Sequence, residues 1–212
     1  MIDATYWLVF LTAAVALNVS PGPDLVYVLS RTITQGKRVG LASAAGVCTG
    51  AFVHVVAAAF GLSAILATSA IAFNLVKYAG AAYLIYLGVK ALRTAGKNFT
   101  LRAAPTPRVS AAVAFRQGVL IDVLNPKVAV FFMAFLPQFV RPEAGSVTIQ
   151  LLFLGSLVIA VAIIIESAFV LAAVKTTGFF RTHPKASVWL DRMMGSVLIA
   201  LGIRLALFEN KH

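Results

Sequence analysis

The sequence predicts an all-α polytopic membrane protein whose six transmembrane helices form two inverted three-helix repeats. Three observations support this fold class. The 212 residues are 60% hydrophobic and 12% charged, whereas soluble domains are about half apolar and about a quarter charged. Long apolar runs recur along the whole chain rather than once. Basic residues gather in alternate links between these runs, which is a signature of membrane topology.

Six apolar segments reach the length of about 20 residues that a helix needs to cross the hydrocarbon core. They cover roughly residues 5–30, 39–67, 71–92, 113–140, 147–174 and 187–208. Helix is expected because lipid offers no water to unpaired backbone groups. We expect one membrane domain over residues 1–212, with repeat one at about 1–93, a cytoplasmic loop at about 94–112 and repeat two at about 113–212.

The distribution of charge predicts the orientation of the segments. The first, third and fifth links hold most of the basic residues, which are Arg31, Lys37 and Arg38, then Arg93, Lys97, Arg102 and Arg108, then Lys175, Arg181 and Lys185. The fourth link holds only Arg141, offset by Glu143. Because positive links stay on the cytoplasmic side, both termini are predicted to be periplasmic. The net charge of +11 thus follows from topology, and nucleic-acid binding is not expected.

Two pairs of similar stretches indicate an internal repeat. Leu84–Lys90 ends the third segment and resembles Leu198–Arg204 at the end of the sixth. Ser20-Pro21 in the first segment corresponds to Asn125-Pro126 in the fourth. Units of three helices must lie in opposite orientations, which is a common plan of secondary transporters. Chance is the alternative, because leucine, isoleucine and glycine match easily in apolar sequence.

The first and fourth segments are both predicted to break near the middle. Two prolines flank Gly22, and each removes a backbone donor and clashes with the preceding turn. Ser20 is expected to cap a second half-helix that starts at Pro21, and Asn125 offers the same start in the fourth segment. Such half-helix N-termini favour an anion such as a carboxylate, and paired interruptions point to a transporter's binding site. Kinks that serve only packing are the alternative. The candidate substrate-binding residues are Ser20, Pro21, Gly22, Pro23, Asp24, Asp122, Asn125, Pro126 and Lys127.

Charged side chains at membrane depth are costly and usually functional. Asp24 and Asp122 lie beside the two breaks, and Lys127 is expected to serve either the substrate or one of these aspartates as a structural partner. Glu166 lies deep in the fifth segment with no obvious partner nearby in sequence, and a protonatable carboxyl group in an apolar site is a natural proton carrier. Histidine in general titrates in a range that suits proton coupling, so His54 is a further candidate, with hydrogen-bonded packing as the alternative. The candidate proton-coupling residues are Glu166, Asp24 and His54.

Three stretches of the chain carry a family resemblance. They are Ser20–Asp24, Lys77–Gly88, and Leu124–Lys127 followed by Phe135–Phe139. In these residues and their order the chain resembles the LysE/RhtB family of amino-acid exporters over essentially its whole length. The resemblance implies a bacterial inner-membrane exporter of amino acids that is driven by the proton gradient.

Within that family the chain is most similar to the homoserine/threonine branch. His54 stands in a Gly-x-x-x-His context that also occurs there, and Glu166 matches an acidic position of that branch. The branch can lack an acidic residue at the place of Asp24. The resemblance therefore implies a proton role for Glu166 more firmly than an ammonium-binding role for Asp24.

The resulting hypothesis is an amino-acid/proton antiporter that works outward. The substrate carboxylate would lie at the half-helix N-termini around Gly22 and Asn125, aided by Lys127, and its ammonium would face Asp24 or Asp122. The expected partners are a small amino acid, protons and the lipid bilayer, and a homodimer is plausible for so small a transporter. No cofactor is expected. No enzymatic activity is expected either, since the sequence shows no nucleophile–base set and no phosphate loop.

Two other classes of protein remain as alternatives. A metal-cation exporter could assemble a site from Asp24, Cys48, His54 and Asp122, although no close ligand spacing such as H-x-x-x-H appears. A non-transporting scaffold would not need matched breaks beside buried acids. A thiol electron carrier needs two cooperating cysteines, and Cys48 is the only one.

Overall fold

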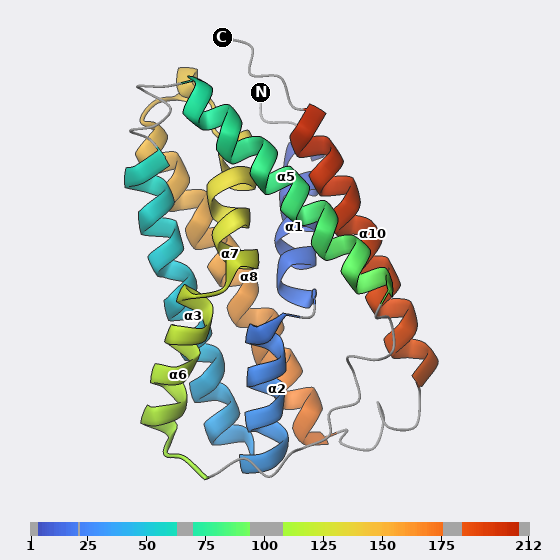
Figure 1. Ribbon diagram of the computed structural model, residues 1–212. Helices are drawn as coiled ribbons and strands as arrows, with labels where there is room; N and C mark the ends of the chain where they lie inside the picture. The colour runs from blue at the N-terminus through green and yellow to red at the C-terminus, as the bar shows by residue number, and fades with distance from the viewer. Residues whose placement is uncertain (1–3, 21, 63–69, 94–107, 176–183, 208–212) are drawn as a thin grey trace.

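The computed structural model describes residues 4–20, 22–62, 70–93, 108–175 and 184–207, and every regular element within these ranges is a helix (Figure 1). The predicted all-α membrane fold is therefore confirmed over the described chain. In order the elements are α1 (Ala4–Val19), α2 (Pro23–Gln35), α3 (Lys37–Ala57), η1 (Ala58–Leu62), α5 (Ala70–Arg93), α6 (Ala111–Val123), α7 (Pro126–Val130), η2 (Phe131–Phe135), η3 (Leu136–Phe139), η4 (Pro142–Ala144), α8 (Val147–Lys175) and α10 (Pro184–Leu207).

The first and fourth predicted segments are bent pairs of helices, as expected from their prolines. α1 and α2 meet at 54°, and α6 meets the stretch from α7 to η3 at 50°. By length and composition each pair could cross a bilayer as one span, and so could α3 with η1, and α8. α5 and α10 contain 24 residues each. At 1.5 Å per residue they extend about 36 Å, but by composition neither belongs to the candidate spans of the described chain, which number up to four with the bent pairs.

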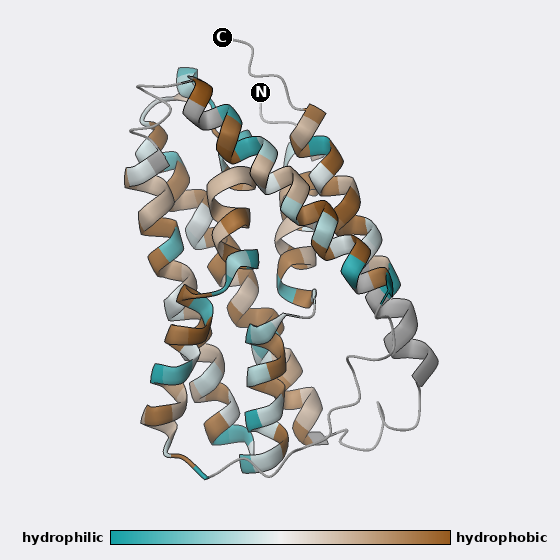
Figure 2. Cartoon of the chain, in the orientation of Figure 1, coloured by the Kyte–Doolittle hydropathy of each residue, from teal (hydrophilic) through white to brown (hydrophobic). Residues whose placement is uncertain are grey.

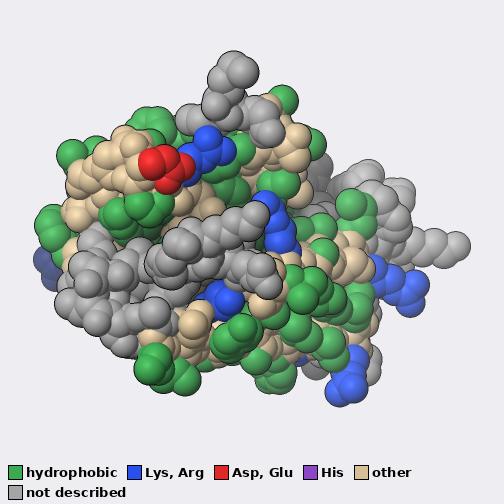
Figure 3. All heavy atoms as spheres, turned by 90° about the horizontal axis from the view of Figure 1, so that it is seen from above, with side chains coloured by type: hydrophobic (Ala, Val, Ile, Leu, Met, Phe, Trp, Pro, Cys, Tyr) green, Lys and Arg blue, Asp and Glu red, His purple; other side chains and the backbone are tan. Residues whose placement is uncertain are grey.

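Successive helical passes alternate in direction. Figure 1 shows the α1–α2 pair, α5 and α8 running down from the upper end, while α3, the α6–α7 pair and α10 return to it. The turn between α2 and α3 lies at the lower end. The short helix η4, which contains Glu143, lies at the upper end, where Figure 3 shows an acidic side chain beside a basic one. The basic residues Lys97, Arg102 and Arg181 lie outside the described residues.

The first link is shorter than the sequence suggested. Gly36 alone separates α2 from α3, with a φ of 86°, a conformation that glycine adopts without steric penalty. Arg31 consequently belongs to α2, and Lys37 is the first residue of α3. Apolar content could not locate this boundary, because the helix continues through polar residues until the glycine reverses the chain.

The pairing of α5 with α10 is symmetric. A Cβ added to Gly88 would lie 2.6 Å from both Gly195 O and Ile199 Cγ1. One added to Gly202 would lie 2.7 Å from Ile85 Cγ1 and 2.9 Å from Ala81 O. When Leu84 is aligned with Leu198, Gly88 falls on Gly202. The residues that each of these glycines contacts then also correspond to one another. The helices therefore pack antiparallel about a pseudo-two-fold axis, as inverted repeats require.

Small residues also bring α3 close to α6, which positions one side of the candidate site. A Cβ on Gly46 would overlap the carbonyl of Phe115, and one on Gly50 would lie 2.7 Å from Val119 O. Small residues allow this close approach in membrane helices. The contact carries the end of α6, with Asp122, against the middle of α3.

The interior is aromatic at the centre, and the outside is apolar. Phe10, Phe131, Phe132 and Phe135 are almost fully buried between α1, η2 and α8. Large apolar side chains are also exposed along the helices, and Figure 2 shows hydrophobic residues, in brown, along the length of each helix. Exposed apolar surface of this extent marks an interaction surface, and here it is the surface that lipid would cover.

Candidate functional site

The first break is built differently from the prediction. Ser20 N donates to Ala16 O at 2.9 Å, so Ser20 still closes the last turn of α1. The N-cap of α2 is Gly22, which has no side chain to form a cap hydrogen bond, and Pro23 takes the first helical position. Pro21, expected as the first helical residue, lies outside the described residues. The expectation for Ser20 was wrong because the second proline, not the first, begins the new helix.

The second break is built as predicted. Asn125 caps α7, since its Oδ1 accepts a hydrogen bond from Lys127 N at 3.1 Å. Pro126 occupies the first helical position, where its missing N–H costs nothing. Asn125 is buried, and its Nδ2 has no hydrogen-bond partner within the described part of the chain.

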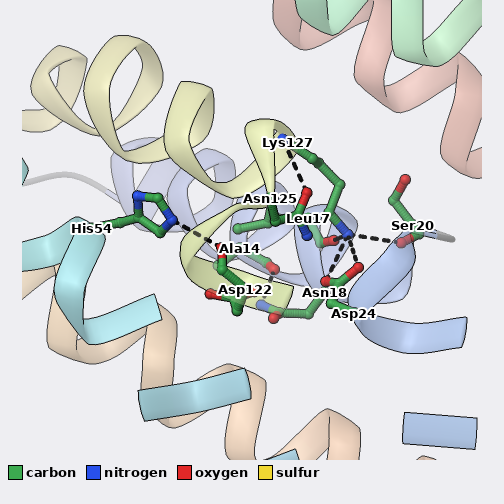
Figure 4. Close-up of polar contacts among 9 residues, drawn as sticks. All are labelled: Ala14, Leu17, Asn18, Ser20, Asp24, His54, Asp122, Asn125 and Lys127. Carbon is green, nitrogen blue, oxygen red and sulfur yellow. Dashed lines mark hydrogen bonds and ion pairs between the residues drawn. The ribbon is translucent and has the colours of Figure 1, made fainter. Parts of the chain in front are cut away.

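An ion pair joins the two breaks (Figure 4). Lys127 Nζ lies 3.0 Å from Asp24 Oδ2 and 3.2 Å from Oδ1, and both side chains are buried. The same ammonium donates to Leu17 O at 3.2 Å and to Ser20 O at 3.1 Å. Of the two aspartates considered as partners for Lys127, the structure selects Asp24. We call the acceptors Leu17 O, Ser20 O and the Asp24 carboxylate the ammonium cradle.

Gly22 leaves the space that this ion pair occupies. A Cβ at this position would overlap Asp24 Oδ1 and would lie 2.7 Å from Lys127 Nζ. Its φ of −137° is open to any residue. Glycine is therefore required here for room rather than for backbone freedom.

His54 contacts the backbone of the second break and not a carboxylate. Its Nε2 lies 3.0 Å from Asp122 O, and because a carbonyl only accepts, Nε2 must carry the proton. The ring also stacks on Phe132, with centroids 6.4 Å apart and planes 6° apart. This placement fits the packing alternative, although the carbonyl that the imidazole contacts lies only three residues before Asn125.

A small cavity joins the three buried carboxyl groups. Its volume is about 10 Å³, about what one water molecule needs. Asp24, Asp122 and Glu166 all line it, and its apolar wall comes from α1, α3, α7, η2 and α8. Within the described residues, Asp122 Oδ2 and Glu166 Oε2 are buried with no hydrogen-bond partner. A buried unpaired carboxylate is costly, so a proton or a cationic ligand would stabilise both groups.

Hydrogen bonds also join the two bent pairs on either side of their breaks. At the upper end Tyr6 OH donates to Phe139 O at 2.7 Å. At the lower end Tyr27 OH donates to Ala114 O at 2.8 Å, and Arg31 Nη2 donates to Gln117 Oε1 at 3.0 Å. We call these the upper and lower latches. The cavity as it stands is far too small for an amino acid.

Several of these groups were not foreseen from the sequence. The Leu17 and Ser20 contributions are backbone carbonyls, which residue type does not reveal. Tyr27 and Arg31 gave a faint signal, because they follow Asp24 at about one-turn intervals along a half-helix. Among the residues that the structure describes, no group of three or more His, Cys, Asp and Glu side chains is placed to hold a metal ion.

Comparison with known proteins matches nearly the whole chain. The family described as LysE type translocator matches residues 15–208. The homoserine/homoserine lactone efflux protein of Salmonella typhi is 33% identical over 201 residues, covering 95% of this chain and 96% of that protein. An uncharacterized membrane protein of Vibrio cholerae is 32% identical over 205 residues, covering 96% and 98%. No solved structure matches the chain.

Proposed function

Since the chain belongs to the family of LysE type translocators, we propose that it exports homoserine, threonine or other neutral amino acids from the cytoplasm in exchange for protons. The observation that carries the proposal is the meeting of two broken helices at a cavity lined by three carboxyl groups. Within the described residues, Asp122 Oδ2 and Glu166 Oε2 are acceptors without a hydrogen-bond partner, and Asn125 Nδ2 at the second break is a donor without one. A zwitterion carries the complementary groups.

The two poles of the substrate would meet opposite partners. The carboxylate would lie at the N-termini of α2 and α7, where helix dipoles and the Asn125 amide favour an anion. The ammonium would face Asp24 or Asp122. The relatives from Salmonella are named for homoserine and its lactone, which share an amino group, whereas the lactone has no free carboxylate. A protein that recognises both compounds would therefore depend mainly on contacts with the ammonium group.

Proton coupling would depend on Glu166. Its carboxyl group is 3% exposed, lines the cavity and comes from α8, outside both breaks. In the proposed cycle it takes up a proton when the cavity opens outward and releases it when the cavity opens to the cytoplasm. His54 would act only through the backbone of Asp122, which it contacts.

Alternating access would follow from the two latches. Opening the lower latch would admit substrate from the end that carries Lys37 and Arg38, which we propose faces the cytoplasm because of its positive charge. Opening the upper latch would release substrate to the periplasm. The protein would then lie in a bacterial inner membrane with both termini outside, and the repeats would rock about the cavity.

The test is efflux of labelled amino acids from proteoliposomes. Vesicles preloaded with homoserine, threonine, leucine or lysine are followed with and without a pH gradient. We expect gradient-dependent efflux of a neutral subset. Gradient-driven movement of a divalent cation, with none of the four amino acids, would instead support the metal-exporter alternative and reject the proposal.

A further inference from the structure

The ammonium cradle is built as a site for a primary ammonium group. Such a group has three N–H donors, and the cradle offers Leu17 O, Ser20 O and the Asp24 carboxylate at 3.0–3.2 Å from Lys127 Nζ. All the acceptors belong to the first break. The ammonium group that occupies the cradle belongs to Lys127 at the second break, 103 residues after Asp24 in the sequence. Figure 4 shows this contact.

The electrostatics of the cradle favour a cation from any source. The two carbonyls lie at the C-terminal end of α1, which is the negative end of its dipole. Asp24 adds a full negative charge, and its side chain is 8% exposed. Nothing in this set recognises the stem of a lysine, because every contact is to the ammonium itself.

The cradle also borders the cavity. Leu17 and Asp24 contribute to the cavity lining, whereas Lys127 does not. An ammonium entering from the cavity therefore meets the same carboxylate that Lys127 holds from the other side. The four-carbon stem of lysine is flexible, so the side chain can leave the cradle without moving α7.

Resting on the proposed function, we infer that the ammonium cradle is the substrate's ammonium subsite and that Lys127 is a resident stand-in which the substrate displaces. The substrate class is then a compound with a free primary ammonium. In the empty transporter Lys127 keeps Asp24 paired, which avoids an uncompensated buried charge.

The test compares homoserine binding to the full-length protein and two variants in lipid nanodiscs, by calorimetry. Lys127→Met leaves no cation to displace, so homoserine should bind about tenfold tighter, equivalent to about one charge-assisted hydrogen bond. Lys127→Arg places a bidentate guanidinium on Asp24, so homoserine should bind more weakly than to the wild type. Lys77→Met is the matched control, since Lys77 is a buried lysine of α5 that contacts the Tyr78 ring, and it should bind homoserine as the wild type does.

A small-molecule probe tests the cradle directly. Methylammonium should bind Lys127→Met and compete there with homoserine, and it should have no effect on the wild type. A homoserine analogue with hydroxyl in place of the ammonium should bind neither protein.

The order of affinities decides the outcome. Weaker homoserine binding to Lys127→Met with near-normal binding to Lys127→Arg would make Lys127 a direct ligand of the substrate and would overturn the inference. Equal homoserine affinities in all folded variants would mean that the ion pair between Lys127 and Asp24 is purely structural, and this result would also overturn the inference. If Lys127→Met does not fold, unchanged or tighter binding to Lys127→Arg still rejects the inference. Failure of the wild type to bind or move any amino acid would reject the proposed function as well.

Discussion

Gly22→Ala is the sharpest test of the site geometry. The added methyl group would overlap Asp24 Oδ1 and lie 2.7 Å from Lys127 Nζ. Both atoms are the ends of flexible side chains, so the backbone can stay in place and the ion pair must shift. The φ of −137° at this position suits alanine, so no backbone strain contributes. The expected loss equals about one charge-assisted hydrogen bond, or about 1.5–3 kcal/mol.

The assay is thermal unfolding of the purified protein in detergent, together with homoserine efflux from proteoliposomes. Gly22→Ala should unfold at a lower temperature and transport poorly. Gly61→Ala is the matched control, because its added methyl would meet no atom within 4 Å, and it should match the wild type in both measurements. If Gly22→Ala unfolds and transports like the control, the ion pair does not depend on this space and the reasoning is refuted.

Three further predictions follow from the described contacts. Glu166→Gln preserves the size of the side chain but cannot take up and release a proton, so gradient-driven homoserine efflux should be lost. Glu143→Gln, on the exposed η4 turn, is the control and should leave this efflux intact. Near-normal antiport in Glu166→Gln would reject the proton-coupling role of Glu166. Tyr27→Phe removes the hydroxyl group of the lower latch, whose hydrogen bond is worth about 1 kcal/mol, so amide hydrogen exchange should become faster along α2. Tyr6→Phe removes the hydroxyl group of the upper latch, so exchange should become faster along η3 instead. The same exchange pattern in the two variants would argue against separate latches. Gly202→Ala should lower the free energy of unfolding by about 1–3 kcal/mol through overpacking of α5 against α10, and an unchanged denaturation midpoint would mean that the two helices separate freely.

The sequence was enough for the helices and for the two breaks. Apolar runs of about 20 residues predict spans, and proline with glycine or asparagine marks where a helix must restart. Asn125 was predicted as a cap correctly because its side chain has a preferred local partner. The same reasoning failed at Ser20, since two prolines two residues apart offer two possible starts and only tertiary packing chooses between them.

The partners across the repeats could not be predicted in the same way. Lys127 had two candidate aspartates, and the choice of Asp24 depends on how α7 is set against the end of α1. The cradle carbonyls of Leu17 and Ser20 are backbone atoms, which the identity of a residue does not encode. Glu166 was singled out correctly as isolated along the sequence, and the structure adds that its Oε2 has no partner within the described chain.

The ion pair between the repeats also bears on how the chain enters the membrane during synthesis. Asp24 is made 103 residues before Lys127, a delay of about 5–20 s at ordinary translation rates. During this delay the first bent pair carries a charge whose insertion into lipid costs about 2.5–3.5 kcal/mol. The two halves are therefore expected to insert as a cooperative unit, with the first held near the insertion machinery until the second arrives. A chain truncated before Asn125 should accordingly be extracted or degraded, whereas the same truncation with Asp24→Asn should persist longer in the membrane.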